Sequence, residues 1–61
     1  MPYINVQVAG KLTKEQKKQI ASEFCETLEK VANKPKKVTY VVFDEVDRDN
    51  WAVGDRLLSE N

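Results

Sequence analysis

The spacing of hydrophobic residues changes period twice along this chain, and no other feature of the sequence limits its possible folds as much. From Tyr3 to Val8 hydrophobic and polar residues alternate, as in a β-strand with one apolar face. From about Lys14 to Ala32 apolar residues recur three and four positions apart, as on one side of an α-helix. Val38–Phe43 is β-branched and aromatic almost throughout, which predicts a second strand. Together these segments predict an α+β fold built on a βαβ unit with a right-handed crossover and parallel strands.

The residues on either side of the expected helix are typical of helix ends. Thr13 is a good N-cap, and Gln16 three positions later completes a capping box. Asn33 suits the left-handed conformation that ends many helices, and Pro35 cannot continue one. Gly10 is the expected turn residue between the first strand and the helix.

The chain is too small to enclose a large core of its own. It has 61 residues, and domains of this size often need disulfides, a metal or partner subunits. Cys25 is the single cysteine and there is no histidine, which excludes an internal disulfide and a zinc site of soft ligands. One helix covers one face of a two-stranded sheet, whereas both faces of Val38–Phe43 are apolar. We therefore expect one domain, residues 1–61, that associates with further copies, with Cys25 as a small buried hydrophobe.

Charge and hydropathy narrow the classes of partner. Ten basic and ten acidic side chains cancel, which argues against nucleic-acid binding because that binding draws on a basic excess. No apolar run is long enough to cross a bilayer and the first residues do not form an export signal, so we expect no membrane partner. The lone thiol then favours the cytoplasm. The polar, turn-prone stretch Asp44–Asn50 lacks the ligand spacing of a calcium loop, and we expect neither metal nor cofactor.

Pro2 is the candidate catalytic residue. An initiator Met before a small residue is normally removed, which would leave Pro2 with a free secondary amine at the start of a strand. Proton transfer needs a base with a pKa near neutrality, and burial lowers the pKa of an amine because it disfavours the charged form. Many chains begin with Met and Pro, so Pro2 alone is weak evidence. A remaining peptide bond to Met1 would turn the base into an amide.

Several motifs in order strengthen the case, and together they resemble the 4-oxalocrotonate tautomerase family. The motifs are Pro2 after Met1, the helix start Thr13–Lys17, Pro35 before a hydrophobic strand, Asp44-Glu45 after it, and Trp51–Gly54 near the end. The resemblance covers essentially the whole chain without a gap. It implies a βαβ protomer with a C-terminal hairpin, assembled as a homohexamer built from dimers.

The same resemblance implies an isomerase that acts on an enol acid. Pro2 would be the general base that moves a proton between carbon and oxygen. Trp51 would be an aromatic wall of the pocket, supplied by a neighbouring subunit. The developing enolate would accept a hydrogen bond from a backbone N–H, the Tyr40 hydroxyl or the Lys11 ammonium.

Two departures from the family bear on the substrate. Family members that act on dicarboxylates have arginines at the positions of Leu12 and Tyr40, and neither residue binds a carboxylate as a guanidinium does. Lys11 is adjacent to the first position and is a candidate replacement, whereas Arg48 and Arg56 are not at family positions. We therefore expect an unsaturated or aryl 2-oxo acid with one carboxylate, such as phenylenolpyruvate, and weaker turnover of a dicarboxylate.

Other interpretations remain open from the sequence. Lys11 is by default a solvated loop charge, Tyr40 a packing residue, and Trp51 an anchor at a subunit interface. Relatives with an N-terminal proline also hydrate, dehalogenate or decarboxylate small acids, for which Asp44 or Glu45 would have to activate water. A non-catalytic oligomeric scaffold is the third alternative.

The catalytic interpretation requires that Met1 is removed. Untagged protein made in a bacterial cytoplasm should have an intact mass one methionine residue below that of the translated chain. Intact mass spectrometry measures this directly. Full retention of Met1 would favour the scaffold instead.

Overall fold

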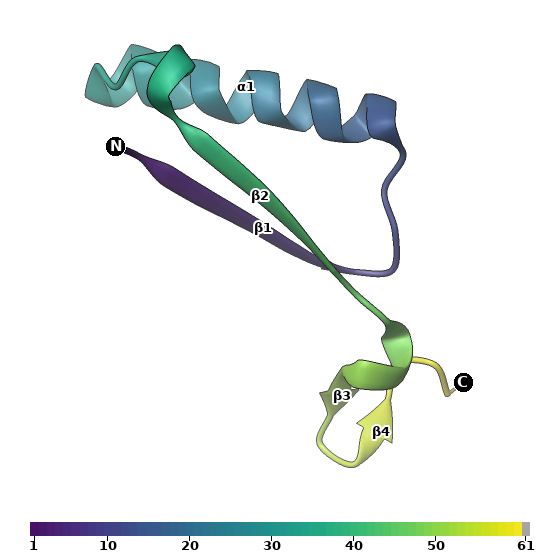
Figure 1. Cartoon of the computed structure of the whole chain (residues 1–61). Coiled ribbons are helices and arrows are strands. Elements are labelled where there is room, and N and C mark those ends of the chain that lie inside the picture. The colour runs from purple at the N-terminus through teal and green to yellow at the C-terminus, as the bar shows by residue number, and fades with distance from the viewer. Residues whose placement is uncertain (61) are drawn as a thin grey trace.

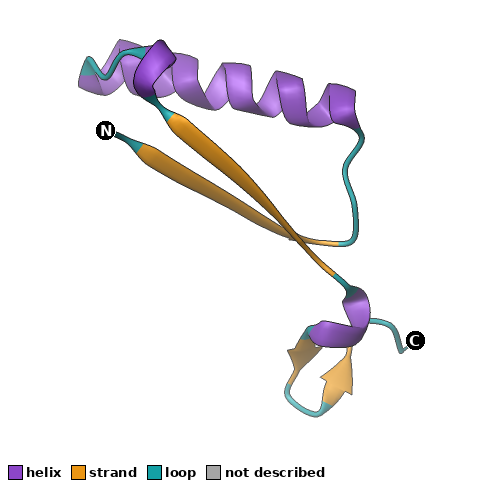
Figure 2. Cartoon of the chain, in the orientation of Figure 1, coloured by secondary structure: helices purple, strands orange, loops and turns teal. Residues whose placement is uncertain are grey.

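The computed structural model describes residues 1–60 and contains a βαβ unit followed by a small hairpin (Figures 1 and 2). Its main elements are β1 (Tyr3–Ala9), α1 (Lys14–Ala32), β2 (Tyr40–Val46), β3 (Ala52–Val53) and β4 (Arg56–Leu57). Two short 3-10 turns, η1 (Lys36–Val38) and η2 (Arg48–Asn50), flank β2. β1 and β2 are parallel, with Tyr3 opposite Tyr40 and Ala9 opposite Val46, and β3 and β4 are antiparallel. The predicted βαβ fold and C-terminal hairpin are confirmed.

The ends of α1 follow from local hydrogen bonding. The Thr13 hydroxyl accepts a hydrogen bond from the Gln16 N–H at 3.1 Å, and the Gln16 side chain accepts from the Thr13 N–H at 2.9 Å. This capping box satisfies backbone donors that the first helical turn leaves free. At the other end Asn33 has the left-handed φ of 57°, and its N–H donates to the Glu29 carbonyl. The predicted bounds of the helix are therefore confirmed.

The bounds predicted for the second strand are wrong at both ends. Val38 belongs to η1, where the Thr39 N–H donates to the Lys36 carbonyl. β2 then continues to Val46, through residues that the sequence predicted as a turn. It continues because β1 offers hydrogen-bonding partners as far as Ala9, and pairing with an existing strand outweighs the weak β-propensity of polar residues.

α1 covers one face of the sheet and leaves the other open, as expected (Figure 1). On the open face Tyr3 is 60% exposed, Tyr40 57% and Val42 43%. Cys25 on α1 is the one residue of the described chain that is buried, which confirms its predicted place. Val31, an apolar residue near the end of α1, is 77% exposed.

The protomer is extended rather than rounded. The hairpin β3–β4 projects away from the layer formed by α1 and the sheet (Figure 1). The radius of gyration is 14.6 Å, whereas a compact domain of this length has roughly 10–11 Å. Among the described residues no helix combines the length and the apolar character that a membrane span needs. A single chain thus leaves most of its apolar side chains in contact with solvent.

Candidate functional site

Pro2 is held at the end of the sheet by β2. Its carbonyl accepts a hydrogen bond from the Tyr40 N–H at 2.9 Å, which ties the residue before β1 to the first residue of β2. The register places Tyr3 opposite Tyr40, so two aromatic side chains lie on the open sheet face beside Pro2. Pro2 itself is half-buried. The structure therefore brings together two of the predicted site residues, Pro2 and Tyr40.

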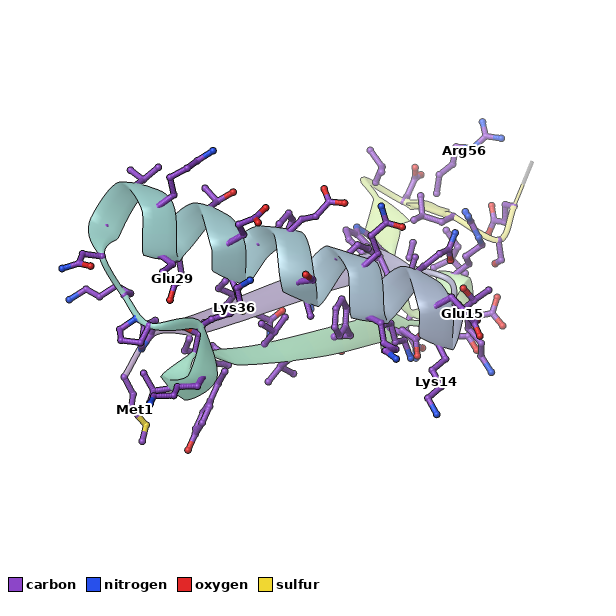
Figure 3. All side chains as sticks on the ribbon, turned by 90° about the horizontal axis from the view of Figure 1, so that it is seen from above. Met1, Lys14, Glu15, Glu29, Lys36 and Arg56 are labelled. Atoms are coloured by element: carbon purple, nitrogen blue, oxygen red, sulfur yellow. The ribbon has the colours of Figure 1, made fainter. Side chains whose placement is uncertain are left out.

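The Pro2 nitrogen becomes a base only when the Met1–Pro2 bond is cut. While Met1 is attached, that nitrogen is a tertiary amide and cannot accept a proton at neutral pH. Met1 is 86% exposed and lies at one end of the molecule (Figure 3). Cleavage would leave the ring amine at the same place, since the Pro2 carbonyl still bonds to β2.

Lys11 and Trp51 lie at the opposite edge of the sheet. Lys11 is exposed in the loop that follows Gly10, and Trp51 is half-buried after η2, where its carbonyl accepts from the Leu58 N–H at 2.8 Å. The seven residues of β1 separate Pro2 from Lys11, and an extended strand of that length spans roughly 20 Å or more. Pro2 and Tyr40 therefore lie at one edge of the sheet, and Lys11 and Trp51 lie beyond the other edge. The four predicted site residues do not converge within one chain.

An open hollow of about 350 Å³ lies at the Lys11 edge. It is lined by Gly10, Lys11, Glu45, Val46, Asp47 and Arg48. Gly10 has a φ of +90°, which a glycine adopts readily, and a Cβ at this position would lie 3.7 Å from Arg48 Nε. The Arg48 guanidinium thus lies directly over the loop that carries Lys11.

Sequence reasoning did not assign Arg48 to this site. The residue is remote from Lys11 along the chain, and nothing in its immediate neighbours indicates a role. Knowledge of the strand register would have placed Arg48 near Lys11. Once Ala9 is paired with Val46, the residues that follow each strand must leave the sheet at the same edge.

Glu45 ties this loop to the sheet and the helix. Its Oε2 accepts the Leu12 N–H at 2.7 Å, and its Oε1 forms an ion pair with Lys17 Nζ at 3.2 Å. The hydrogen bond from Leu12, followed by the one from Lys17, lowers the pKa of the Glu45 carboxyl from its ordinary value. Because both carboxylate oxygens are engaged, Glu45 is a poor candidate for activating water. Asp44 is also engaged, since its Oδ2 accepts from Gln7 Nε2 at 2.9 Å.

Leu12 is apolar and supplies no positive charge to this edge of the sheet. Its half-buried side chain lines a second hollow, of about 260 Å³, along α1. The other lining residues are Gln16, Gln19, Ile20, Glu23 and Phe24. Besides Lys17, which pairs with Glu45, positive charge at this edge of the sheet comes from Lys11 and Arg48 in the first hollow.

Comparison with known proteins identifies the family. The family model described as a tautomerase enzyme matches residues 2–61. The chain belongs to the tautomerase family. A relative named probable tautomerase K2, from Dickeya dadantii, is 34% identical over 61 residues, which is 98% of this chain and 91% of that protein. The resemblance inferred from the sequence is thereby confirmed.

Solved tautomerase structures share the fold over nearly the whole length. DmpI from Helicobacter pylori has a TM-score of 0.83 and 33% identity, covering 93% of this chain and 90% of that chain. A homologue of 4-oxalocrotonate tautomerase has a TM-score of 0.89 and 26% identity, covering 100% of this chain and 97% of that chain. The fold of this chain is therefore shared over nearly its whole length with both of these structures.

The environment of Glu45 predicts how this tautomerase responds to acid. Its lowered pKa means that the folded state favours the ionised carboxyl. The resulting stability is fully present above the unfolded pKa of about 4.3 and is lost as the pH falls through the lower folded value. Glu45→Gln should therefore lower the urea midpoint at pH 7 and flatten its decline in acid, as measured by circular dichroism at fixed protein concentration.

Glu26→Gln is the matched control, because Glu26 is exposed on α1. This variant should keep the wild-type dependence of stability on pH. An unchanged acid dependence in Glu45→Gln would show that the contacts with Leu12 and Lys17 contribute nothing to stability.

Proposed function

We propose that this chain is a keto–enol tautomerase that uses the Pro2 amine, after removal of Met1, as its general base. The substrate would be an unsaturated or aryl 2-oxo acid, and the reaction an isomerisation that moves one proton between carbon and oxygen. Membership of the tautomerase family over residues 2–61 is the observation that carries this proposal. The hydrogen bond that holds Pro2 at the start of the sheet supports it, because a catalytic base must be held in place.

The chemistry requires an amine that is unprotonated at neutral pH. An ordinary α-amine has a pKa of about 7.7–8.0, and a prolyl amine in water has a higher one. A dry, cationic site lowers that value, because both burial and nearby positive charge disfavour the protonated amine. Tyr3 and Tyr40 would provide apolar surface beside Pro2, and the Tyr40 hydroxyl is positioned on the same face as a candidate donor to the enolate.

The proposed site is completed by a second copy of the chain. In one protomer Pro2 and Tyr40 lie at one edge of the sheet, and Lys11 and Trp51 lie beyond the other edge. A substrate that contacts Pro2 and either Lys11 or Trp51 must therefore lie between protomers. The open sheet face and the projecting hairpin would bury apolar surface in such an assembly. We propose the homohexamer built from dimers, in the cytoplasm, where the free thiol of Cys25 stays reduced.

The assembly is tested by its mass. Native mass spectrometry or light scattering should give six times the 7.0 kDa of one chain. Val42→Asp should reduce this assembly, because it places a charge on the open apolar face, and Ser22→Asp on the exposed side of α1 should not. A stable monomer in the wild-type protein would contradict the proposal.

The role of Pro2 is tested by the ketonisation of phenylenolpyruvate, followed by its ultraviolet absorbance. Pro2→Ala should lower kcat/KM by roughly 100-fold or more, the usual contribution of a general base. A variant with one extra residue before Pro2 keeps the ring but converts its nitrogen to an amide, and it should be inactive. Tyr3→Phe is the control, because it changes a neighbour of Pro2 and leaves the amine free.

Two results would count against this function. An undiminished rate in the Pro2 variants would exclude the amine as the base. Turnover of a dicarboxylate enol as efficient as that of phenylenolpyruvate would contradict the expected substrate class, although it would leave the base in place.

A further inference from the structure

The hollow over Gly10 gathers positive charge from two separate segments. Lys11 comes from the loop after β1, and Arg48 comes from η2 after β2. They meet over Gly10, where Arg48 Nε lies 3.7 Å from the point at which a side chain would begin. Within residues 1–60 neither cation takes part in an ion pair, since the pair found there is Lys17 with Glu45. Both cations are therefore available to an incoming anion.

The carboxylates at the hollow do not cancel this charge. Glu45 is occupied by the Lys17 ammonium and the Leu12 N–H, so its charge is already compensated. One oxygen of Asp47, Oδ1, accepts the Asp49 N–H at 3.1 Å and caps η2. The cations at the hollow are Lys11, Lys17 and Arg48, and the carboxylates are Glu45 and Asp47. The hollow therefore has a net charge of one positive unit. This excess matches a single carboxylate.

The volume and shape of the hollow agree with a small organic acid. About 350 Å³ lies at the lower end of the range for small-molecule sites. Arg48 offers a planar fork of N–H donors that fits the two oxygens of a carboxylate, whereas Lys11 offers a point charge. Val46 adds an apolar part to the lining.

We propose that this hollow is an anion subsite in which Arg48, assisted by Lys11, binds the carboxylate of the substrate. The identity of the acid rests on the proposed function, whereas the existence of the subsite does not. Arg48 is then a specificity-determining residue at which one carboxylate binds. The acid bound there would reach Pro2 of another copy, because Pro2 of the same chain lies at the far edge of the sheet.

The test is binding of cinnamate, an aryl monoacid that has no enol to convert. Arg48 and Arg56 are the arginines of the chain, so their side-chain Nε–H signals can be followed separately by NMR. Cinnamate should shift the Arg48 signal and leave that of Arg56, which lies on β4 and does not line the hollow. Neutral cinnamamide should shift neither signal, and inorganic phosphate shows whether the subsite takes any anion or prefers a carboxylate.

Variants measure how much Arg48 contributes to the binding of cinnamate. Arg48→Met should weaken cinnamate binding roughly tenfold or more, as expected for loss of a charge-assisted hydrogen bond. Arg48→Lys should be intermediate, because it keeps the charge and loses the fork. Arg56→Met is the matched control and should bind as the wild type does. With phenylenolpyruvate, Arg48→Met should raise KM more than it lowers kcat.

The outcomes separate the subsite from the catalytic proposal. Cinnamate binding that depends on Arg48 supports the subsite even if Pro2→Ala retains full activity, in which case the assignment of Pro2 as the base is wrong and the subsite stands. Cinnamate binding equal in the wild type and in Arg48→Met overturns the subsite, even if Pro2 proves essential. Tighter binding of phosphate than of cinnamate also overturns it, because the hollow would then be a general phosphate site.

Discussion

Parallel pairing of β1 with β2 starts where the Tyr40 N–H donates to the Pro2 carbonyl and ends where the Gly10 N–H donates to the Val46 carbonyl. Both candidate functional regions are fixed by these two ends of one hydrogen-bonded ladder. A slip of one residue would exchange the two faces of the moving strand, exposing its apolar side chains and burying its polar ones. It would also move the residues after β2 away from Gly10. The register is thus the physical constraint that positions both the terminal proline and the cationic hollow.

The second constraint is that one chain cannot enclose its own core. A single helix lies on a two-stranded sheet, and Cys25 is the one buried residue of the part that the structure describes. Part of the apolar surface that remains open lies on the sheet face beside Pro2, at Tyr3, Tyr40 and Val42. In the proposed assembly this surface would both hold the subunits together and lower the polarity around the catalytic amine. Stability and catalysis would then draw on the same burial of apolar surface.

Local patterns were sufficient to predict the helix and the βαβ order. The capping box of Thr13 and Gln16 and the left-handed Asn33 act within a few residues, so the sequence shows them directly. The bounds of β2 could not be predicted in this way. Asp44-Glu45-Val46 has a polar, turn-like composition and becomes a strand because β1 provides a partner for it. Likewise, no local pattern pairs Lys17 with Glu45, and only the fold brings the two side chains together.

The sequence by itself determined the elements, their order, the helix ends and the family resemblance, because each depends on residues close together in the chain or on their order along it. Tertiary structure alone decided which site residues are neighbours. It placed Tyr40 beside Pro2, separated both from Lys11, and brought Arg48 over Gly10. The physical reason is that such proximity depends on the alignment of two strands that are distant in sequence, which no local spacing of residue types encodes.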